Sequence, residues 1–229
     1  MSSWFNKLYE TFIVDNNYEL LIEGFRNTII ITLCALLIGV IIGTIIAIAK
    51  YFVEGNSKLK FVSWICDIYV TVIRGIPITV LLLIFFFIII VGDTDGIMTC
   101  IIAYGINTGA YMAELIRSGI NAVEKGQMEA ARSLGMSKGQ AMAKIIMPQA
   151  IKNILPAIGN ECIALLKETS VAGYVTVVDL TRAANLVRTN TNDAINPLIL
   201  LALVYLILVV IMTKLLSIFE RRLQKSNGK

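Results

Sequence analysis

Long runs of apolar residues alternate with short polar segments along this chain. Residues 27–49 contain no charged side chain, and residues 194–213 form a second uncharged run near the C-terminus. A transmembrane helix needs about 20 apolar residues to cross a hydrocarbon core of about 30 Å. The pattern therefore predicts membrane-spanning helices at about 25–49 and 195–219.

Small residues recur within the first of these predicted spans. Gly39, Gly43 and Ala47 lie four positions apart, which places them on one face of a helix. Small side chains on one face let a second helix approach closely, although such spacings also arise by chance. We expect another helix to pack against this face.

The next apolar region, at about 60–91, is too long for one straight span. Arg74, Gly75 and Pro77 interrupt it, and proline in a helix removes a backbone hydrogen bond and kinks the chain. We therefore expect this span to be kinked at 75–77.

Two further spans are expected, at about 97–118 and at about 151–173. The second contains Asn160, Glu161 and further charged residues, so hydropathy alone supports it only weakly. The whole pattern predicts an all-α integral membrane protein in which a single membrane domain covers residues 1–229.

A polar, helix-prone stretch lies between these last two spans and predicts two short helices around a turn. Residues 129–134 are good helix formers, and Gly135 follows where helices commonly end in a left-handed glycine. Ser137 can cap the next helix while Gln140 reaches back to its amide, as in a capping box. We expect Pro148 to end that helix.

Two interpretations of this polar stretch are open from the residues alone. Ala130 and Ala131 are small enough to let a partner helix approach closely, and Glu129 can accept hydrogen bonds from that partner. In the other interpretation, the stretch is an amphipathic loop that lies on the membrane surface.

Composition narrows the class of protein. With 57% hydrophobic and 16% charged residues, the chain is too apolar for an ordinary soluble domain. It has no histidine, and its four cysteines stand singly in apolar segments, so neither a metal site nor a disulfide framework is indicated. The positions of the basic residues explain the net charge of +4, and we expect no nucleic-acid partner.

Several motifs carry a resemblance to a known family. The segment at 129–148, EAARSLGMSKGQAMAKIIMP, resembles the EAA loop of permease subunits of ABC importers. RGIP at 74–77, AYMAE at 110–114 and KETS at 167–170 are similar to the branch that imports polar amino acids. The resemblance extends over about 24–222 and implies the five-transmembrane-helix type I importer permease fold, with a cytoplasmic coupling loop at about 119–148.

The resemblance also implies partners and a cellular location. A permease of this kind works with two ABC ATPase subunits, a second permease subunit that is identical or a close paralogue, and an extracellular or periplasmic amino-acid-binding protein, in the bacterial cell membrane. ATP and Mg²⁺ belong to the ATPase subunits, because this chain has no G-x-x-x-x-G-K-[ST] phosphate-binding loop. We therefore expect no catalytic residue and no cofactor in this chain. The residues implied in ATPase coupling are Glu129, Ala130, Ala131, Gly135 and Ser137.

The distribution of lysine and arginine predicts the orientation. If the loop at 119–148 is cytoplasmic, most basic residues lie on the inner face, as the positive-inside rule requires. Five spans then place the N-terminus outside and the C-terminus in the cytoplasm. Residues 1–26 carry several acidic side chains, unlike a cleaved signal peptide, so we expect the first span to be retained.

Charged residues inside membrane spans are candidates for cargo binding, because a central Arg or Asp costs about 2.5–3.5 kcal/mol. Arg74 could bind the carboxylate of an amino acid, and Asp67 or Glu161 its ammonium group. Thr71 and Asn160 complete the candidate set. The alternative is that Arg74 pairs with Asp67 or satisfies carbonyls at the kink.

The identity of the cargo stays open among glutamine, glutamate, cystine, histidine and arginine. Some similar carriers of basic amino acids hold an acid at the position of Thr71, so the resemblance favours an uncharged or polar cargo. An ATP-independent secondary transporter or channel would share the apolar spans but would not need the capped turn. A membrane-embedded enzyme has no supporting cluster of residues.

Overall fold

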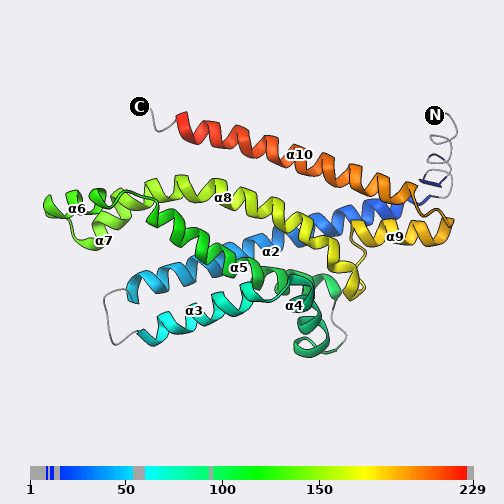
Figure 1. The fold of residues 1–229 in the computed structure, drawn as a ribbon, viewed down its shortest axis with the longest axis horizontal. Helices are drawn as coiled ribbons and strands as arrows, with labels where there is room; N and C mark the ends of the chain where they lie inside the picture. Colours follow the sequence, from blue (N-terminus) through cyan, green and yellow to red (C-terminus); the bar gives the residue numbers. More distant parts are fainter. Residues whose placement is uncertain (1–8, 10, 13–15, 54–59, 93–94, 226–229) are drawn as a thin grey trace. The chain divides into compact units, whose positions relative to one another are not determined.

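The computed structural model describes residues 9, 11–12, 16–53, 60–92 and 95–225, and the regular elements among them are all helical (Figure 1). η3 and η4 are π-helical and η5 is a 3₁₀ helix. In chain order the elements from α2 onward are α2 (Tyr18–Val53), α3 (Lys60–Gly75), α4 (Ile78–Ile84), η3 (Phe85–Ile89), α5 (Gly96–Asn121), α6 (Lys125–Ser133), α7 (Lys138–Ala141), η4 (Met142–Ile146), α8 (Met147–Glu168), η5 (Thr169–Val175), α9 (Leu180–Thr191) and α10 (Asn196–Lys225).

The chain divides into two compact units. Unit 1 comprises Met1–Leu36, Pro77–Tyr104 and Ile163–Thr213, and unit 2 comprises Leu37–Ile76, Gly105–Cys162 and Lys214–Lys229. The boundaries fall inside α2, α5, α8 and α10, so each unit contains part of these helices. Every candidate site residue named from the sequence belongs to unit 2.

Within the part of the chain that the structure describes, two helices, α2 and α10, are long and apolar enough to cross a membrane. A third span is reached if α3 and the pair α4–η3 are counted together as one broken span. The first predicted span, 25–49, lies within α2, and the last, 195–219, begins one residue before α10 and otherwise lies within it. The predicted count of five spans stays a prediction, and both chain termini lie outside the described residues.

The interruption predicted at 75–77 is a complete break between α3 and α4. Helix α3 ends at Gly75, where the Ile76 amide donates to the Ile73 carbonyl oxygen at 3.4 Å. Pro77 then has the extended ψ of 136°, and α4 begins at the next residue. A proline disfavours the helical conformation of the residue before it, so a break here follows from the sequence.

In unit 1, the start of α9 is attached to α2 by buried polar contacts. The Asn27 amide group donates to the Val178 carbonyl oxygen at 2.9 Å, and the Leu180 amide donates to the Thr28 hydroxyl at 3.2 Å. Asp179 caps α9 by accepting from two backbone amides of the first turn. Burial raises the pKa of the Asp179 carboxyl, while these amide donors act in the opposite direction.

In unit 2, α2 and α5 pack closely through glycine. A Cβ atom on Gly43 would lie 2.8 Å from the Ala113 amide nitrogen, and one on Gly39 would lie 2.6 Å from Thr108 Cβ. On α5, a Cβ on Gly109 would lie 2.7 Å from Ile42 Cγ2. The expectation that another helix packs against the small-residue face of the first span is confirmed.

A Gly43→Ala substitution is expected to lower the free energy of unfolding by about 1–3 kcal/mol, because the added methyl group overpacks the α2–α5 contact. Thermal unfolding of the detergent-purified protein measures the loss. Gly126→Ala is the matched control, since a Cβ at Gly126 in α6 would meet no atom closer than 4.0 Å. Equal unfolding temperatures for the two variants would show that α2 and α5 tolerate the extra volume.

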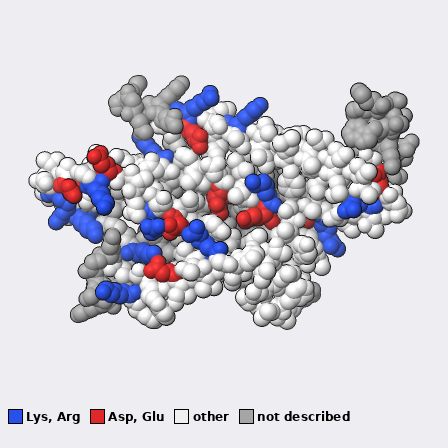
Figure 2. All heavy atoms as spheres, in the orientation of Figure 1, with Lys and Arg blue, Asp and Glu red and all other residues white. Residues whose placement is uncertain are grey.

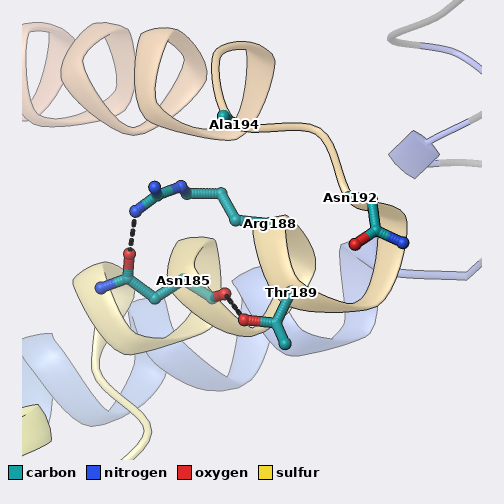
Figure 3. A pocket seen from close by; sticks show the side chains of 5 residues that line it. All are labelled: Asn185, Arg188, Thr189, Asn192 and Ala194. Carbon is teal, nitrogen blue, oxygen red and sulfur yellow. Dashed lines mark hydrogen bonds between the residues drawn. The ribbon is translucent and has the colours of Figure 1, made fainter.

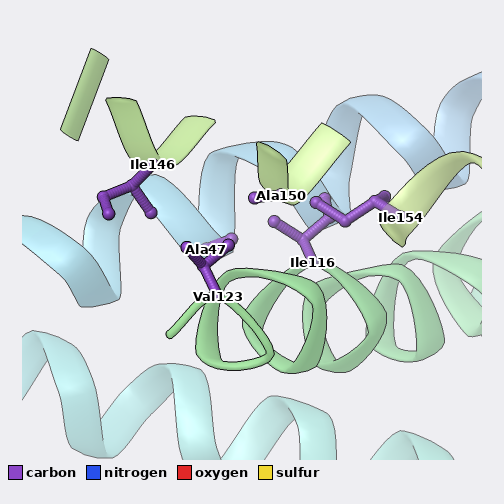
Figure 4. Packing of buried hydrophobic residues seen from close by; sticks show 6 residues of the cluster. All are labelled: Ala47, Ile116, Val123, Ile146, Ala150 and Ile154. Atoms are coloured by element: carbon purple, nitrogen blue, oxygen red, sulfur yellow. The ribbon is translucent and has the colours of Figure 1, made fainter. Parts of the chain in front are cut away.

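A hydrophobic cluster in unit 2 joins α2, α5, η4 and α8 (Figure 4). Its side chains are buried and come from segments far apart in the sequence, which brings both ends of the polar stretch onto the same core as the end of α2. Gly119 extends the contact, because a Cβ there would collide with Ile154. The cluster consists of Ala47, Ile116, Val123, Ile146, Ala150 and Ile154.

Two predicted boundaries in the polar stretch are wrong. The first short helix begins at Lys125 rather than Glu129, because the residues just before Glu129 are themselves compatible with a helix. The second helix does not end at Pro148, since α7, η4 and α8 follow one another without a gap. The π-helical turn η4 comes directly before the proline region, and its wider pattern of hydrogen bonds interrupts the i to i−4 ladder that proline would disturb.

Candidate functional site

The turn between α6 and α7 has the geometry that the sequence predicts. Gly135 has a φ of +85°, in the left-handed region that glycine adopts most easily. The Gly135 amide donates to the Arg132 carbonyl at 3.0 Å, and the Met136 amide donates to the Ala131 carbonyl at 3.2 Å. These two bonds form a Schellman motif and satisfy carbonyls at the end of α6.

Ser137 closes the other side of the turn. The Gln140 amide donates to Ser137 Oγ at 3.2 Å, and the Ser137 amide donates to Gln140 Oε1 at 2.9 Å. The predicted capping box is therefore confirmed. Because both helix ends are capped locally, the turn holds its shape through its own residues.

The exposed side chains of α6 define what this turn offers to a partner. Glu129 and Ala130 are exposed, whereas Ala131 is only 4% exposed and faces the interior, so one alanine of the pair is available for contact. Leu134 is 85% exposed at the end of α6. Sequence reasoning did not select Leu134, because the exposure of an apolar side chain depends on what packs against it and not on the local pattern.

Charged side chains surround this turn. Figure 2 shows a largely uncharged surface, with a dense group of acidic and basic side chains over α6 and α7. Lys138 at the start of α7 turns back toward α2, and its Nζ lies 5.2 Å from the centre of the Tyr51 ring. This cation–π contact attaches α7 to the end of α2.

A second group of charged residues in unit 2 lies on α2, α3 and α5, and we call it the polar seam. Lys50 Nζ lies 2.5 Å from Asp67 Oδ1, which joins α2 to α3. On α5, Arg117 Nε donates to Glu114 Oε2 at 3.0 Å, and Arg117 Nη2 donates to the other carboxylate oxygen. The members of the seam are Lys50, Asp67, Arg74, Tyr111, Glu114 and Arg117.

Arg74 occupies a different environment from the other bases of the seam. Its guanidinium carbon lies 5.0 Å from the centre of the Tyr111 ring on α5. No carboxylate within the described part of the chain lies within 4.0 Å of it. Of the two alternatives left open from the sequence, pairing with Asp67 is not what the structure shows, because Asp67 contacts Lys50.

The remaining candidates lie on two helices. Thr71 is exposed on α3, between Asp67 and Arg74. Asn160 is exposed on α8 and donates to the Pro156 carbonyl oxygen at 3.1 Å, and Glu161 follows it in a half-buried position. Asp67, Thr71 and Arg74 therefore lie on α3, which contributes two residues to the polar seam. Asn160 and Glu161 lie on α8.

Sequence reasoning did not select Lys50, Tyr111, Glu114 or Arg117 as site residues. Glu114 and Arg117 are three positions apart, a spacing that places opposite charges side by side on a helix, and this signal could have identified them. Lys50 and Asp67 are 17 positions apart on different helices, so their pairing depends on tertiary packing.

Unit 1 carries a polar pocket at the end of α9 (Figure 3). Arg188 Nη1 donates to Asn185 Oδ1 at 2.9 Å, and the Thr189 hydroxyl donates to the Asn185 carbonyl oxygen at 3.0 Å. Asn192 and Ala194 complete its lining. None of the residues predicted from the sequence lines this pocket.

Comparison with known proteins places the chain among membrane transport subunits. A family model described as binding-protein-dependent transport system inner membrane component matches residues 35–225. The arginine transport system permease protein ArtQ of Bacillus subtilis is 37% identical over 210 residues, which cover 90% of this chain and 93% of ArtQ. The probable glutamine ABC transporter permease protein GlnM of the same organism is 36% identical over 220 residues, covering 93% and 98%.

Chains in solved structures are also similar to this chain. A chain in the crystal structure of an amino acid ABC transporter with histidines is 40% identical, has a TM-score of 0.85, and the match covers 91% of this chain and 96% of that chain. A chain of the MetNI methionine ABC transporter in an inward-facing conformation is 21% identical with a TM-score of 0.73, covering 90% and 97%, and shares the fold.

Proposed function

Because this chain belongs to the family of binding-protein-dependent transport system inner membrane components, we propose how it works as the membrane-spanning permease subunit of an ATP-driven importer of polar amino acids. Its relatives are permeases described for arginine and for glutamine. The observation that carries the mechanism is the exposed turn between α6 and α7, which is capped on both sides and attached to α2 and α8. ATP hydrolysis takes place in a separate subunit.

The turn is the proposed contact for the ATPase. Glu129 can accept hydrogen bonds from the partner, Ala130 allows close approach, and Leu134 can enter an apolar pocket. Gly135 and Ser137 do not need to touch the partner, because their role is to hold the shape of the turn. ATP and Mg²⁺ bind on the ATPase subunits in this scheme, and no residue of this chain contacts them.

The wider assembly follows from the same proposal. Two ATPase subunits meet two permease subunits, which are identical or close paralogues, and an external binding protein delivers the cargo. The chain crosses the bacterial cell membrane five times, with the N-terminus outside and the α6–α7 turn in the cytoplasm. Closure of the ATPase subunits moves the turn, and the cluster in unit 2 carries this movement to α2, α5 and α8.

Arg74 is the proposed contact for the carboxylate of the cargo. Its guanidinium has no carboxylate partner among the described residues, and it stands at the end of α3, where the helix leaves backbone carbonyls without intrahelical donors. A guanidinium can bind a carboxylate through two parallel hydrogen bonds. The free carbonyls can accept from the ammonium group, and Thr71 one turn earlier offers a further hydroxyl.

Affinity purification in mild detergent tests the proposed function. We expect an ABC ATPase to co-purify with the tagged chain, and polar amino acids to stimulate its ATP hydrolysis in proteoliposomes. A chain that purifies without an ATPase and still carries amino acids in the absence of ATP would instead be a secondary transporter or channel.

A further inference from the structure

The polar pocket of unit 1 is built around an arginine that has few hydrogen-bond acceptors. Arg188 is half-buried, and its Nη1 donates to Asn185 Oδ1 at 2.9 Å. Its Nε is buried and has no hydrogen-bond partner among the described residues, and none of their carboxylates lies within 4.0 Å of the guanidinium. A guanidinium carries five N–H donors, and unpaired donors on a partly buried cation are costly. The pocket therefore favours a ligand that supplies anionic acceptors.

The amide groups of the pocket also suit an anion. Because Asn185 Oδ1 accepts from Arg188, the same side chain keeps two N–H donors for a ligand. Asn192 adds a second amide just after α9. Figure 3 shows the Arg188 guanidinium between α9 and the segment that carries Ala194, so these donors lie beside one opening.

The acid that is nearest to the pocket in the sequence is engaged elsewhere. Asp193 is 6% exposed, and its carboxylate accepts from the backbone amides of Ile195 and Asn196 at 3.1 and 3.2 Å. It also accepts from the Asn196 side chain at 2.6 Å. Helix α9 itself contains no acidic residue. The side chains that line the pocket therefore carry one positive charge and no negative charge.

The pocket lies where the chain enters the membrane. Ala194, which lines it, is the first residue of the uncharged run at 194–213. Helix α10 begins at Asn196 and is long and apolar enough to cross a membrane. A helix of about 20 residues measures about 30 Å, the thickness of the hydrocarbon core. The residues just before this run therefore lie at the level of the lipid headgroups.

Exposed apolar side chains continue from the pocket along α10. Ile195 directly follows Ala194 and is 65% exposed, and Ile199 and Leu203 are 42% and 44% exposed. These three residues are four positions apart, so they follow one face of the helix. Acyl chains cover such a face without cost. A donor-rich pocket beside an apolar face matches the two parts of a phospholipid, its phosphate and its acyl chains.

We infer that this pocket binds the phosphate of a phospholipid headgroup, whose acyl chains lie along the exposed face of α10. The Nη groups of Arg188 and the amide group of Asn185 donate to the phosphate oxygens, since a guanidinium binds phosphate through parallel hydrogen bonds. Phosphatidylglycerol is favoured over phosphatidylcholine, because the choline ammonium carries the same sign of charge as Arg188. The inference goes beyond the proposed function and depends only on α10 crossing the membrane.

Binding of lipid to the full chain in detergent tests this inference. Native mass spectrometry measures the affinity of the most tightly retained dioleoylphosphatidylglycerol, with dioleoylphosphatidylcholine for comparison. We expect Arg188→Gln to weaken the binding of phosphatidylglycerol at least about tenfold, or about 1.4 kcal/mol, because a charge-assisted contact is lost. Arg26→Gln is the matched control. It removes the same charge from an exposed position on α2, outside the pocket, and should leave the affinity unchanged.

A second variant closes the pocket instead of emptying it. Ala194 is exposed, so Ala194→Glu should not disturb the packing, and its carboxylate should pair with Arg188. We expect this variant to lose phosphatidylglycerol binding as Arg188→Gln does, with an unchanged unfolding temperature. Inorganic phosphate and dihexanoylphosphatidylglycerol carry the phosphate without long acyl chains. At equal concentration, neither should displace the dioleoyl lipid.

Three results would overturn the inference. The first is equal affinity for phosphatidylglycerol in Arg188→Gln and the unmodified chain, or an equal loss in Arg26→Gln. The second is displacement of the lipid by inorganic phosphate, which would make the pocket a site for a free anion. The third is weaker binding of the external binding protein to Arg188→Gln with lipid binding unchanged, which would assign the pocket to an acidic side chain of that protein. Co-purification of the ATPase tests the proposed function separately.

Discussion

Replacing Gly135 with valine is expected to separate the chain from its ATPase and to abolish ATP-driven uptake. The φ of +85° at Gly135 costs an ordinary L-residue about 1–2 kcal/mol, and a β-branched side chain is strained further. A Cβ at this position would meet no atom within 4 Å, so the effect comes from the backbone alone. The turn should lose the bonds that end α6, and with them the shape that the ATPase binds.

Gly139→Val provides the matched control. A Cβ at Gly139 also meets no atom within 4 Å, but this glycine lies in α7 and does not have a positive φ. The yield of co-purified ATPase and the initial rate of uptake in proteoliposomes measure both variants. Normal recovery of the ATPase with the Gly135→Val chain would show that the left-handed turn is not needed for docking.

Arg74→Ala is expected to abolish transport while the complex stays assembled. Hydrogen bonds to a charged group contribute about 1.5–3 kcal/mol each, so the loss of a two-bond contact with the cargo carboxylate should lower its affinity by about a hundredfold or more. Arg74 is exposed and lies over the ring of Tyr111, so its removal should leave the packing of α3 and α5 intact.

Two comparisons sharpen this prediction. Arg74→Lys keeps the charge but loses the planar pair of donors, and it should retain part of the activity. Arg222→Ala removes an exposed arginine from α10 and should transport normally. Uptake by Arg74→Ala that equals the unmodified protein, with the same amount of ATPase bound, would remove Arg74 from the cargo site.

The turn between α6 and α7 could be predicted from the sequence because its determinants are local. Gly135 needs only its own φ to end a helix, and Ser137 and Gln140 are three residues apart. The break near Pro77 is local for the same reason, since proline constrains the residue before it. The positions of the long apolar helices could also be predicted, because their apolar runs are much longer than an error of a few residues at each end.

The contents of the polar seam could not be predicted in the same way. The pairing of Lys50 with Asp67 depends on how α2 and α3 pack, and the position of Arg74 on Tyr111 depends on α5. The inward-facing Ala131 shows the same limit, because small size alone does not tell which face of a helix is covered. The helix end predicted at Pro148 is wrong because the π-helical turn η4 precedes this proline and lets α7 continue into α8.

The contact of Lys138 with Tyr51 has a mechanical consequence. Helix α7 continues through η4 into α8, and its first residue is fastened to the last turns of α2. Val123 and Ile146 bury the two flanks of the same stretch against Ala47. Because the stretch contacts α2 both through Lys138 and through the cluster, we expect a displacement of its tip to be passed on to the parts of α2 and α8 that lie in unit 2.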